Sequence, residues 1–386
     1  MKNKDLSLYI HIPFCERKCL YCDFLSGPAD AHLRDTYVQA LLLEIESYRN
    51  TPLAKRNITT VFVGGGTPSI LTEEQMTAVF EKLRDVFAFR NDCEITIEMN
   101  PGTVTEEKTK CYLKNGINRV SIGLQSPDDE LLKRLGRIHN YQQFLDTYQM
   151  LRAAGVKNIN IDLMSALPGQ TVEMYCDGLQ KVLELEPEHI SAYSLILEED
   201  TPFYEMYNNG RILLPDEETD RLMYERTGEI LHKAGYGRYE ISNYAKAGFE
   251  CRHNTVYWER GDYLGIGLGS ASLIGHCRFK NTSDLNVYTE KWLAGNGSEV
   301  QRMEEEQLAE KDEMEEFMFL GLRMMRGVSK EKFRRQFGQD IQAVYSDEIG
   351  QLMKQELLAC SDDGSRISLT KKGIDVSNYV FEQFLL

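Results

Sequence analysis

The sequence has no long hydrophobic run and no surplus of positive charge. No stretch approaches the roughly 20 uninterrupted apolar residues that a membrane-spanning helix requires, so we do not expect an integral membrane protein. The 386 residues include 44 Lys and Arg against 60 Asp and Glu, which gives a formal net charge of −16. This balance repels phosphate backbones unless a local basic stripe overrides it, and no such stripe is present. Nucleic acid is therefore not an expected partner.

Neither the first residues nor the cysteines follow the pattern expected of a secreted protein. Its first 14 residues carry charges but neither a long apolar run nor a small-residue cleavage site, which predicts a cytoplasmic protein. Nine cysteines are an odd number for a secreted disulfide framework. Three of them cluster between residues 15 and 22. The other six are expected to be small buried apolar side chains: Cys93, Cys111, Cys176, Cys251, Cys277 and Cys360.

Short apolar segments alternate with amphipathic ones over about the first 200 residues. The expected strands are 6–12, 59–65, 94–100, 119–125, 158–164 and 189–195, and the expected helices are 33–49, 72–88, 105–115, 128–154, 171–184 and one past 215. Strands that are apolar on both faces predict an α/β fold in which a parallel sheet is covered by helices. We expect a partial (β/α)6 barrel, with ligand-handling residues at the carboxyl ends of its strands.

The pattern divides the chain into three regions. Residues 1–235 form the expected partial barrel. Residues 236–300 are rich in Gly and aromatic residues with little helical periodicity, which predicts additional strands and loops that close the barrel. Residues 301–386 are helical and charged, and end in a strand-like piece followed by an amphipathic helix, which predicts a small winged-helix-like domain. The acidic balance argues against DNA binding by this domain.

Three cysteines lie on one loop directly after the first expected strand: Cys15, Cys19 and Cys22. A zinc site would need a fourth Cys or His. His11 belongs to an alternating strand segment, so strand geometry argues against its reaching the same centre. A disulfide is disfavoured in a reducing compartment. A distant His remains an alternative zinc ligand. A third interpretation is an iron-sulfur cubane with one iron that has no protein ligand.

The C-x3-C-x2-C spacing, with the aromatic Tyr21 just before the last cysteine, resembles the radical S-adenosylmethionine superfamily. The resemblance implies that Cys15, Cys19 and Cys22 hold a 4Fe-4S cluster. It also implies that the open iron chelates the amino and carboxylate groups of S-adenosylmethionine.

A glycine-rich turn, Gly64-Gly65-Gly66-Thr67-Pro68, follows the second expected strand. Glycines let the backbone approach a ligand closely, although such a segment alone could be only a tight turn. One βα unit after the cysteines, it resembles the superfamily's methionine-binding turn with Thr67 in place of Glu. This version is typical of the family that contains oxygen-independent coproporphyrinogen III oxidase.

Further residues match positions at which that family binds S-adenosylmethionine: Tyr9, Glu98, Gln125, Arg137 and Asp162. Carboxylates can accept hydrogen bonds from ribose hydroxyls or the amino group, and arginine can pair with the methionine carboxylate. Any one of these residues alone would be read as a salt-bridged or capping residue. His139 is expected to be a structural neighbour of Arg137.

Two features separate this chain from the oxidases of the family. The oxidases carry a fourth cysteine where this chain has Phe24, and a long N-terminal extension, whereas the first strand here is expected near residue 6. Segments 239–245, 251–258, 263–272 and 369–385 instead resemble the HemW group of haem-binding chaperones. The motif around 265–270 is expected to be close backbone packing rather than a dinucleotide loop.

The resemblance to the HemW group implies a haem chaperone that also binds a 4Fe-4S cluster and S-adenosylmethionine. Such a protein delivers haem to haem-requiring apoproteins, with transient contact to membrane proteins, as a monomer or a homodimer. The alternative is a coproporphyrinogen III oxidase or another radical enzyme that modifies a tetrapyrrole. A zinc-binding structural protein is a third, weaker interpretation. In the first case Tyr21 and Phe24 also belong to the cofactor-binding region.

His253, in the segment HNTVYW, is the candidate haem residue. Its imidazole stands beside Tyr257 and Trp258, whose flat surfaces suit a porphyrin. A single His among aromatic residues is more often a hydrogen-bonded packing residue, and it is the family resemblance that implies a haem role. Cys251 is an alternative thiolate ligand.

Overall fold

The computed structural model describes residues 5–385 and contains the parallel sheet that the sequence predicts. Six parallel strands lie side by side in chain order: β1 (Asp5–Ile12), β2 (Asn57–Gly65), β3 (Ala88–Met99), β4 (Arg119–Gln125), β5 (Ile159–Ser165) and β6 (His189–Ser194). Their side chains are mostly buried on both faces. This is why these strands read as nearly continuous apolar segments rather than alternating ones.

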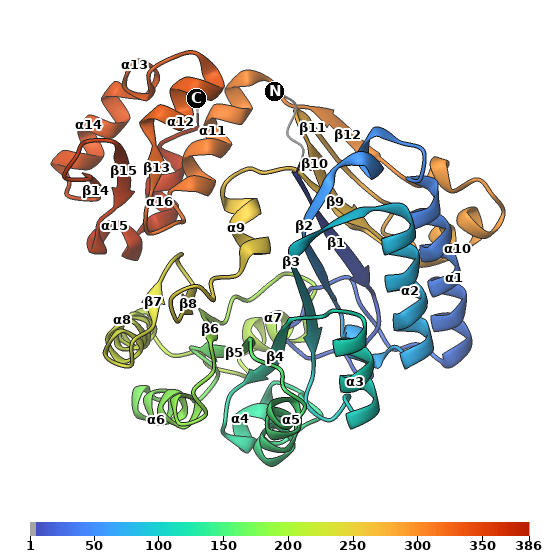
Figure 1. The fold of residues 1–386 in the computed structure, drawn as a ribbon. Helices are drawn as coiled ribbons and strands as arrows, with labels where there is room; N and C mark the ends of the chain where they lie inside the picture. The colour runs from blue at the N-terminus through green and yellow to red at the C-terminus, as the bar shows by residue number, and fades with distance from the viewer. Residues whose placement is uncertain (1–4, 386) are drawn as a thin grey trace.

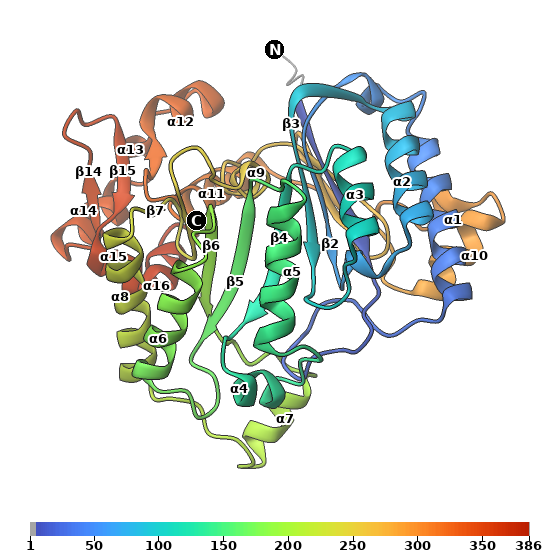
Figure 2. The ribbon, with the colours of Figure 1, turned by 60° about the horizontal axis from the view of Figure 1, so that its bottom comes forward.

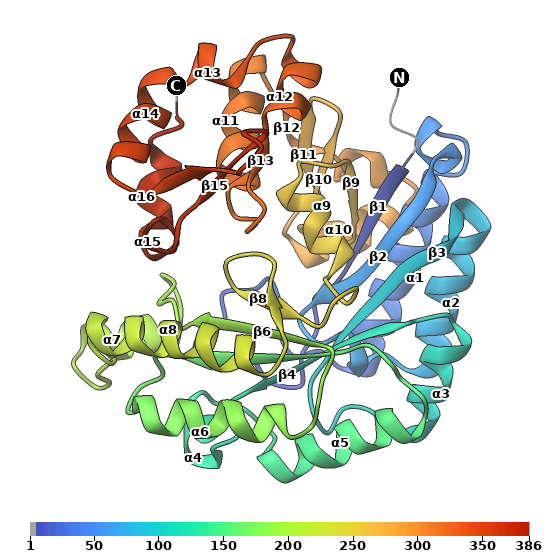
Figure 3. The same ribbon diagram turned by 60° about the vertical axis from the view of Figure 1, so that its left-hand side comes forward.

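Helices cover the outer face of the sheet: α1 (Ala31–Ser47), α2 (Glu73–Val86), α3 (Glu106–Lys114), α5 (Tyr141–Ala153), α6 (Val172–Leu183) and α8 (Glu217–Lys233), as seen in Figures 1 and 3. The start of α2 is fixed by a capping box, in which Thr72 and Gln75 bond each other's backbone N–H groups. Short α4 (Asp129–Arg134) and α7 (Pro202–Asn208) lie beyond the carboxyl ends of the strands (Figure 2). Three short 3-10 segments also occur within residues 5–385: Pro52–Lys55, Pro68–Ile70 and Gly297–Glu299.

The single helix expected over 128–154 is wrong, because α4 and α5 are separate. Gly136 has φ +75°, a left-handed conformation that ends α4 and suits glycine. The Asn140 side chain then accepts from the backbone N–H of Gln143 and begins α5. The break leaves Arg137 in a loop at the site rather than on a helix face.

Additional strands extend both edges of the sheet, which has 12 strands over residues 5–385. On the β1 edge lie β9 (Tyr263–Ile266), β10 (Ala271–Ile274), β11 (Cys277–Lys280) and β12 (Met303–Gln307), and on the β6 edge lie β8 (Asn243–Ala245) and β7 (Gly237–Arg238). The two sets do not pair with each other. The region also contains two helices that periodicity did not reveal, α9 (Arg252–Trp258) and α10 (Leu285–Leu293).

The C-terminal residues form a helical unit with its own apolar core and a small antiparallel sheet (Figure 1). Its elements are α11 (Glu310–Gly321), β13 (Val328–Ser329), α12 (Lys330–Phe337), α13 (Ile341–Val344), α14 (Ser346–Lys354), β14 (Leu358–Cys360), β15 (Arg366–Leu369), α15 (Lys371–Asp375) and α16 (Ser377–Glu382). Across residues 5–385, no helix is long and apolar enough to cross a membrane.

The six scattered cysteines are not all buried as expected. Cys93, Cys251 and Cys277 are buried, whereas Cys111 and Cys176 are partly exposed and Cys360 is exposed. For Cys360, the reason is its place on β14, which is an edge strand of the small sheet. Residue type alone does not reveal that position.

A close contact between two loops positions the cysteines. Because β1 and β2 are parallel neighbours, the loops that follow them meet at the same edge of the sheet. The backbone N–H of Gly66 donates to Ile12 O at 2.9 Å, and that of Thr67 donates to Phe14 O at 2.7 Å. A Cβ on Gly66 would lie 2.6 Å from Phe14 O and 2.9 Å from Cys15 Sγ. Only glycine fits there.

We therefore expect Gly66→Ala to lower the free energy of unfolding by about 1–3 kcal/mol, because overpacking forces the cysteine loop away. Urea unfolding followed by circular dichroism measures this. Gly27→Ala in the same loop is the matched control, since no atom lies within 4 Å of a Cβ built there. Equal stabilities of the two variants would contradict the expectation.

Candidate functional site

Two of the clustered thiols accept side-chain hydrogen bonds from residues outside the cysteine loop. Thr67 Oγ1 donates to Cys15 Sγ at 3.4 Å, and Arg137 Nη1 donates to Cys19 Sγ at 3.6 Å. Within residues 5–385, no group of three or more His, Cys, Asp or Glu side chains is close enough to hold a metal ion. Cys15, Cys19 and Cys22 share one loop, and the pKa of Cys22 is raised by burial and also by its neighbours Cys19 and Cys15.

Arg137 is the centre of a polar network beside these thiols. Its Nη2 donates to Asn100 Oδ1 at 2.7 Å and also to the carbonyl oxygen of Gly123. Asn100 Nδ2 donates in turn to Thr67 Oγ1 at 2.8 Å. Arg137 Nε is buried and has no partner among the described residues. The arginine is thus held rigidly while retaining a donor for a ligand.

A small cavity lies against this network, and Cys19, Thr67, Asn100 and Arg137 line it. The sequence predicted three of these residues and missed Asn100. The sequence could have indicated Asn100, because this residue directly follows β3 and precedes Pro101. It lies at the same strand end as Glu98, which was predicted.

Two partly buried carboxylates lie on β3 and β5, the strands on either side of β4. Glu98 Oε2 accepts from the backbone N–H of Gly65 at 3.1 Å. Asp162 accepts from Asn160 Nδ2 at 2.7 Å and from Ser121 Oγ at 3.3 Å. Burial, and next the charge of Asp162, raises the pKa of Glu98 to about 8. A cation bound beside them would favour the ionised form of both acids.

The other predicted residues surround these groups at different depths. Tyr9 and Tyr21 are placed by ring contacts with Phe62 at 6.3 Å and with Phe203 at 6.4 Å, respectively. Gln125 is buried at the end of β4 with φ +70°, and its Oε1 accepts from Tyr193 OH at 3.1 Å. The hydrogen bond of Gln125 therefore leads to Tyr193 on β6 rather than to the cysteines.

Phe24 does not join this group. Its side chain is 61% exposed, and Lys18 Nζ donates to its backbone carbonyl oxygen at 2.9 Å. Where a fourth cysteine would stand, the loop therefore presents an apolar ring to solvent.

His11 is not available as a fourth metal ligand. Its Nε2 is hydrogen-bonded to Leu25 O at 2.9 Å and its Nδ1 to Tyr9 OH at 3.0 Å. Both ring nitrogens are thus used, which disfavours the zinc interpretation.

The other two expectations for structural residues agree with the structure. His139 is buried, and burial followed by the charge of Arg137 lowers its pKa to about 3, so it is a neutral neighbour of Arg137. A Cβ on Gly267 would lie 2.6 Å from Tyr37 OH, so segment 265–270 is close backbone packing.

Helix α9, which carries the HNTVYW segment, is held by a residue distant in sequence. Its N-cap, Cys251, provides no side-chain cap. The Glu94 carboxylate on β3 instead accepts from the backbone N–H groups of Arg252 at 3.1 Å and His253 at 3.0 Å. An acidic group at a helix N-terminus is stabilising, so Glu94 fixes α9 against the sheet.

His253 lies inside this packing, away from the cysteine loop. Its Nδ1 is hydrogen-bonded to Thr60 Oγ1 at 2.7 Å and its Nε2 to Tyr257 OH at 2.8 Å. Burial, then the charge of Arg119, lowers its pKa to about 3, so the ring is neutral. Cys251 is fully buried, and burial raises its pKa to about 11, which keeps it a thiol rather than a thiolate.

The raised pKa of Glu98 gives a testable pH dependence. Between pH 4.5 and about 8 the folded chain holds a proton on Glu98 that the unfolded chain has lost, so this group lowers stability as pH rises. Glu98→Gln removes the effect. The difference in melting temperature, variant minus parent, is expected to grow across that window.

Thermal unfolding of the ligand-free protein at each pH measures this difference. Exposed Glu106→Gln, the same chemical change on the surface of α3, is the control and should show a constant difference. A constant difference for Glu98→Gln as well would show that Glu98 titrates normally.

Comparisons with known proteins agree with this geometry. Residues 9–181 match the Radical SAM superfamily, and residues 308–376 match the HemN C-terminal domain. A protein of Lactococcus lactis named Heme chaperone HemW is 40% identical, with alignment of 100% of this chain and 99% of that protein. A Bacillus subtilis protein of the same name is 36% identical, over 98% and 99% of the two chains.

Among solved structures, coproporphyrinogen III oxidase (HemN) from Escherichia coli has a TM-score of 0.85 at 24% identity, over 99% of this chain and 90% of that one. That likeness shows a shared fold. The resemblance predicted from the cysteine loop and the later motifs is confirmed by the full-length relatives. The chain belongs to the HemW family of the radical S-adenosylmethionine superfamily.

Proposed function

We propose that this protein is a haem chaperone that also binds a 4Fe-4S cluster and S-adenosylmethionine. The observation that carries the proposal is the similarity, over essentially the whole chain, to proteins named Heme chaperone HemW. Haem-requiring apoproteins are the proposed acceptors, including membrane proteins reached by transient contact. We also propose that the protein acts in the cytoplasm. All nine cysteines are free thiols, which fits a reducing compartment.

The residues of the loop fit an iron-sulfur cluster. Cys15, Cys19 and Cys22 would hold three irons, and the fourth iron would be open to S-adenosylmethionine. Gly66 leaves room beside Cys15 Sγ, where a Cβ would lie at 2.9 Å. When bound, a reduced cluster of this type supplies the electron that cleaves the sulfonium of S-adenosylmethionine.

The chain's own groups would orient that ligand. The unpartnered Nε of Arg137 suits the methionine carboxylate, and the turn of Gly65, Gly66 and Thr67 suits the methionine end. Glu98 and Asp162 would face its cationic or hydroxyl groups. Tyr9, Tyr21, Gln125 and the exposed Phe24 are proposed to line the surrounding space.

The assignment of His253 to haem stays a prediction. In this structure its two ring nitrogens are bonded to Thr60 and Tyr257, and its side chain is buried. Iron ligation by His253 would require the hydrogen bond on the ligating nitrogen to break, which is the bond to Tyr257 for Nε2 or the bond to Thr60 for Nδ1.

Cluster loading tests the first half of the proposal. Protein purified without oxygen is expected to be brown and to contain about four irons and four sulfides per chain, as a 4Fe-4S cluster requires. Cys19→Ala should lose most of this iron, because one of three thiolate ligands is missing. Cys176→Ala, a partly exposed cysteine on α6, is the control. Retention of iron by Cys19→Ala would contradict the assignment, and zinc in place of iron would support the structural alternative.

Haem binding and catalysis separate the chaperone from the oxidase. We expect the protein to bind haem with a shifted Soret band and to pass it to a haem-requiring apoprotein. Reduced protein given S-adenosylmethionine and coproporphyrinogen III should form no protoporphyrinogen at useful turnover, measured by fluorescence after oxidation. Sustained product formation would overturn the proposal in favour of the oxidase.

A further inference from the structure

A cavity of about 750 Å³ lies between the sheet, α9 and the C-terminal unit. Its wall includes Thr60 of β2, Thr255 and Val256 of α9, and the 324–326 segment that links α11 to β13. This size falls within the range of about 300–1,000 Å³ that small-molecule and cofactor sites occupy. None of the three clustered cysteines and none of the predicted S-adenosylmethionine residues lines it.

The lining carries positive charge in a chain that is strongly acidic overall. Arg238, Arg252 and Arg326 face it against a single acid, Glu250. Arg252 pairs with Asp92, and Arg326 pairs with Glu259. The arginine side chains of these pairs are 44% and 50% exposed, so the existing ion pairs are weak and a ligand carboxylate can compete with them.

Other residues of the cavity lining are apolar, and two of them are methionines with flexible side chains. Met324 and Met325 both contribute to it, beside Val256 and Tyr239. A thioether is a haem-iron ligand in proteins and also packs well on flat rings. A ligand that suits these walls is a flat apolar molecule with carboxylates and a metal centre.

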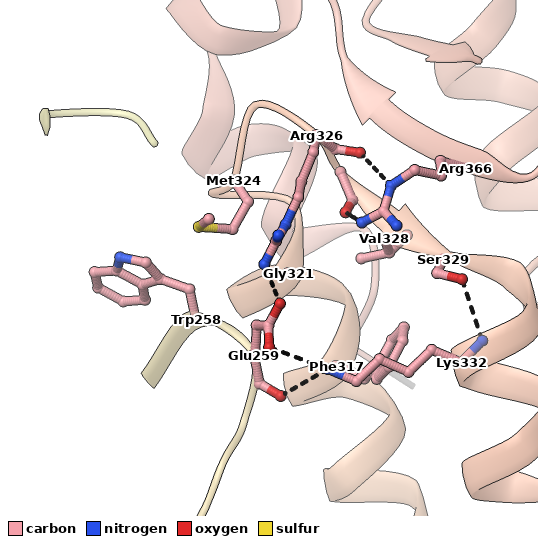
Figure 4. A pocket seen from close by; sticks show the side chains of 11 residues that line it. Trp258, Glu259, Phe317, Gly321, Met324, Arg326, Val328, Ser329, Lys332 and Arg366 are labelled. Carbon is pink, nitrogen blue, oxygen red and sulfur yellow. Dashed lines mark hydrogen bonds and ion pairs between the residues drawn. The ribbon is translucent and has the colours of Figure 1, made fainter. Parts of the chain in front are cut away.

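The two methionines differ in their freedom. Met324 is 5% exposed and extends toward Trp258 beside a second, smaller cavity of about 120 Å³ (Figure 4). Met325 is partly exposed, and its backbone N–H donates to Tyr239 O at 2.9 Å. That bond fastens the 324–326 segment to the β7–β8 region and leaves the Met325 side chain as the available thioether.

The cavity also explains how a haem role and an enclosed His253 coexist. Thr60, a wall residue, is the hydrogen-bond partner of His253 Nδ1 at 2.7 Å. Thr255 and Val256, two and three residues further along α9, form part of the same wall. The histidine therefore supports the wall from behind while its own nitrogens stay occupied.

We propose that this interdomain cavity is the haem site, with Arg252 and Arg326 holding the two propionates and the Met325 thioether contacting the iron. The inference rests on the proposed haem-chaperone function and assigns its ligand set. The ligand spans the sheet and the C-terminal unit, so haem binding joins the two parts of the chain.

The test is haem titration of the full-length protein, followed by absorbance, with haem dimethyl ester as a second probe. The parent is expected to bind haem at least tenfold more tightly than the ester, whose propionates carry no charge. The double variant Arg252→Ala/Arg326→Ala should lose this preference, and Arg252→Lys/Arg326→Lys should recover part of it. Equal binding of both probes by the parent would overturn the propionate assignment.

Spectra of Met325 variants test the iron contact. Met325→Leu should change the Soret band of bound haem, and Met325→His should move it toward that of an imidazole complex, which a residue far from iron could not do. Met324→Leu is the matched control and should leave the band in place. An unchanged band in both Met325 variants, or loss of axial ligation only in His253→Ala, would overturn the Met325 assignment.

The outcomes separate this inference from the function on which it rests. If the parent binds and transfers haem but every cavity variant matches it, the site is wrong and the chaperone function stands. If the parent binds neither haem nor its ester, the proposed function itself fails. Circular dichroism melts of each variant confirm that it is folded.

Discussion

The site depends on the fit of the Gly64–Thr67 turn against the first turn of the cysteine loop. Gly66 and Thr67 donate their backbone N–H groups to the segment that ends β1, and a side chain on Gly66 would push the two apart. From this contact the hydrogen bonds run from Thr67 to Asn100 and from Asn100 to Arg137. Four loops at one end of the sheet are thereby held in one arrangement before any ligand binds.

Much of this arrangement could be predicted because its causes are local in sequence. Apolar strands, cysteine spacing and a glycine turn leave their patterns within a few residues, and parallel pairing then brings their ends together. The break at Gly136 was also local, yet the helical periodicity on both sides of it concealed it. A left-handed glycine and an Asn cap outweighed that periodicity.

The features that could not be predicted depend on residues far apart in the chain. Glu94 accepts hydrogen bonds from Arg252 and His253 of α9, which are 158 and 159 residues away in the sequence. No pattern in either segment predicts this contact. A motif likewise cannot show whether an imidazole nitrogen is free, and the partners that occupy His253 come from β2 and from its own helix. The interdomain cavity belongs to the same class, because its walls come from three regions of the sequence.

Strand β3 sets the distance between the Gly65 turn and helix α9. Glu94 anchors α9, and Glu98 on the same strand accepts from the Gly65 turn. Four residues of extended strand separate them by about 13 Å at 3.3 Å per residue. Substitution of Glu94 or Glu98 changes the strength of the contact that the residue makes. The distance between the two positions is set by the extended backbone and does not change with the side chain. The sheet thus acts as a fixed spacer between the sulfur-rich loop and the aromatic helix.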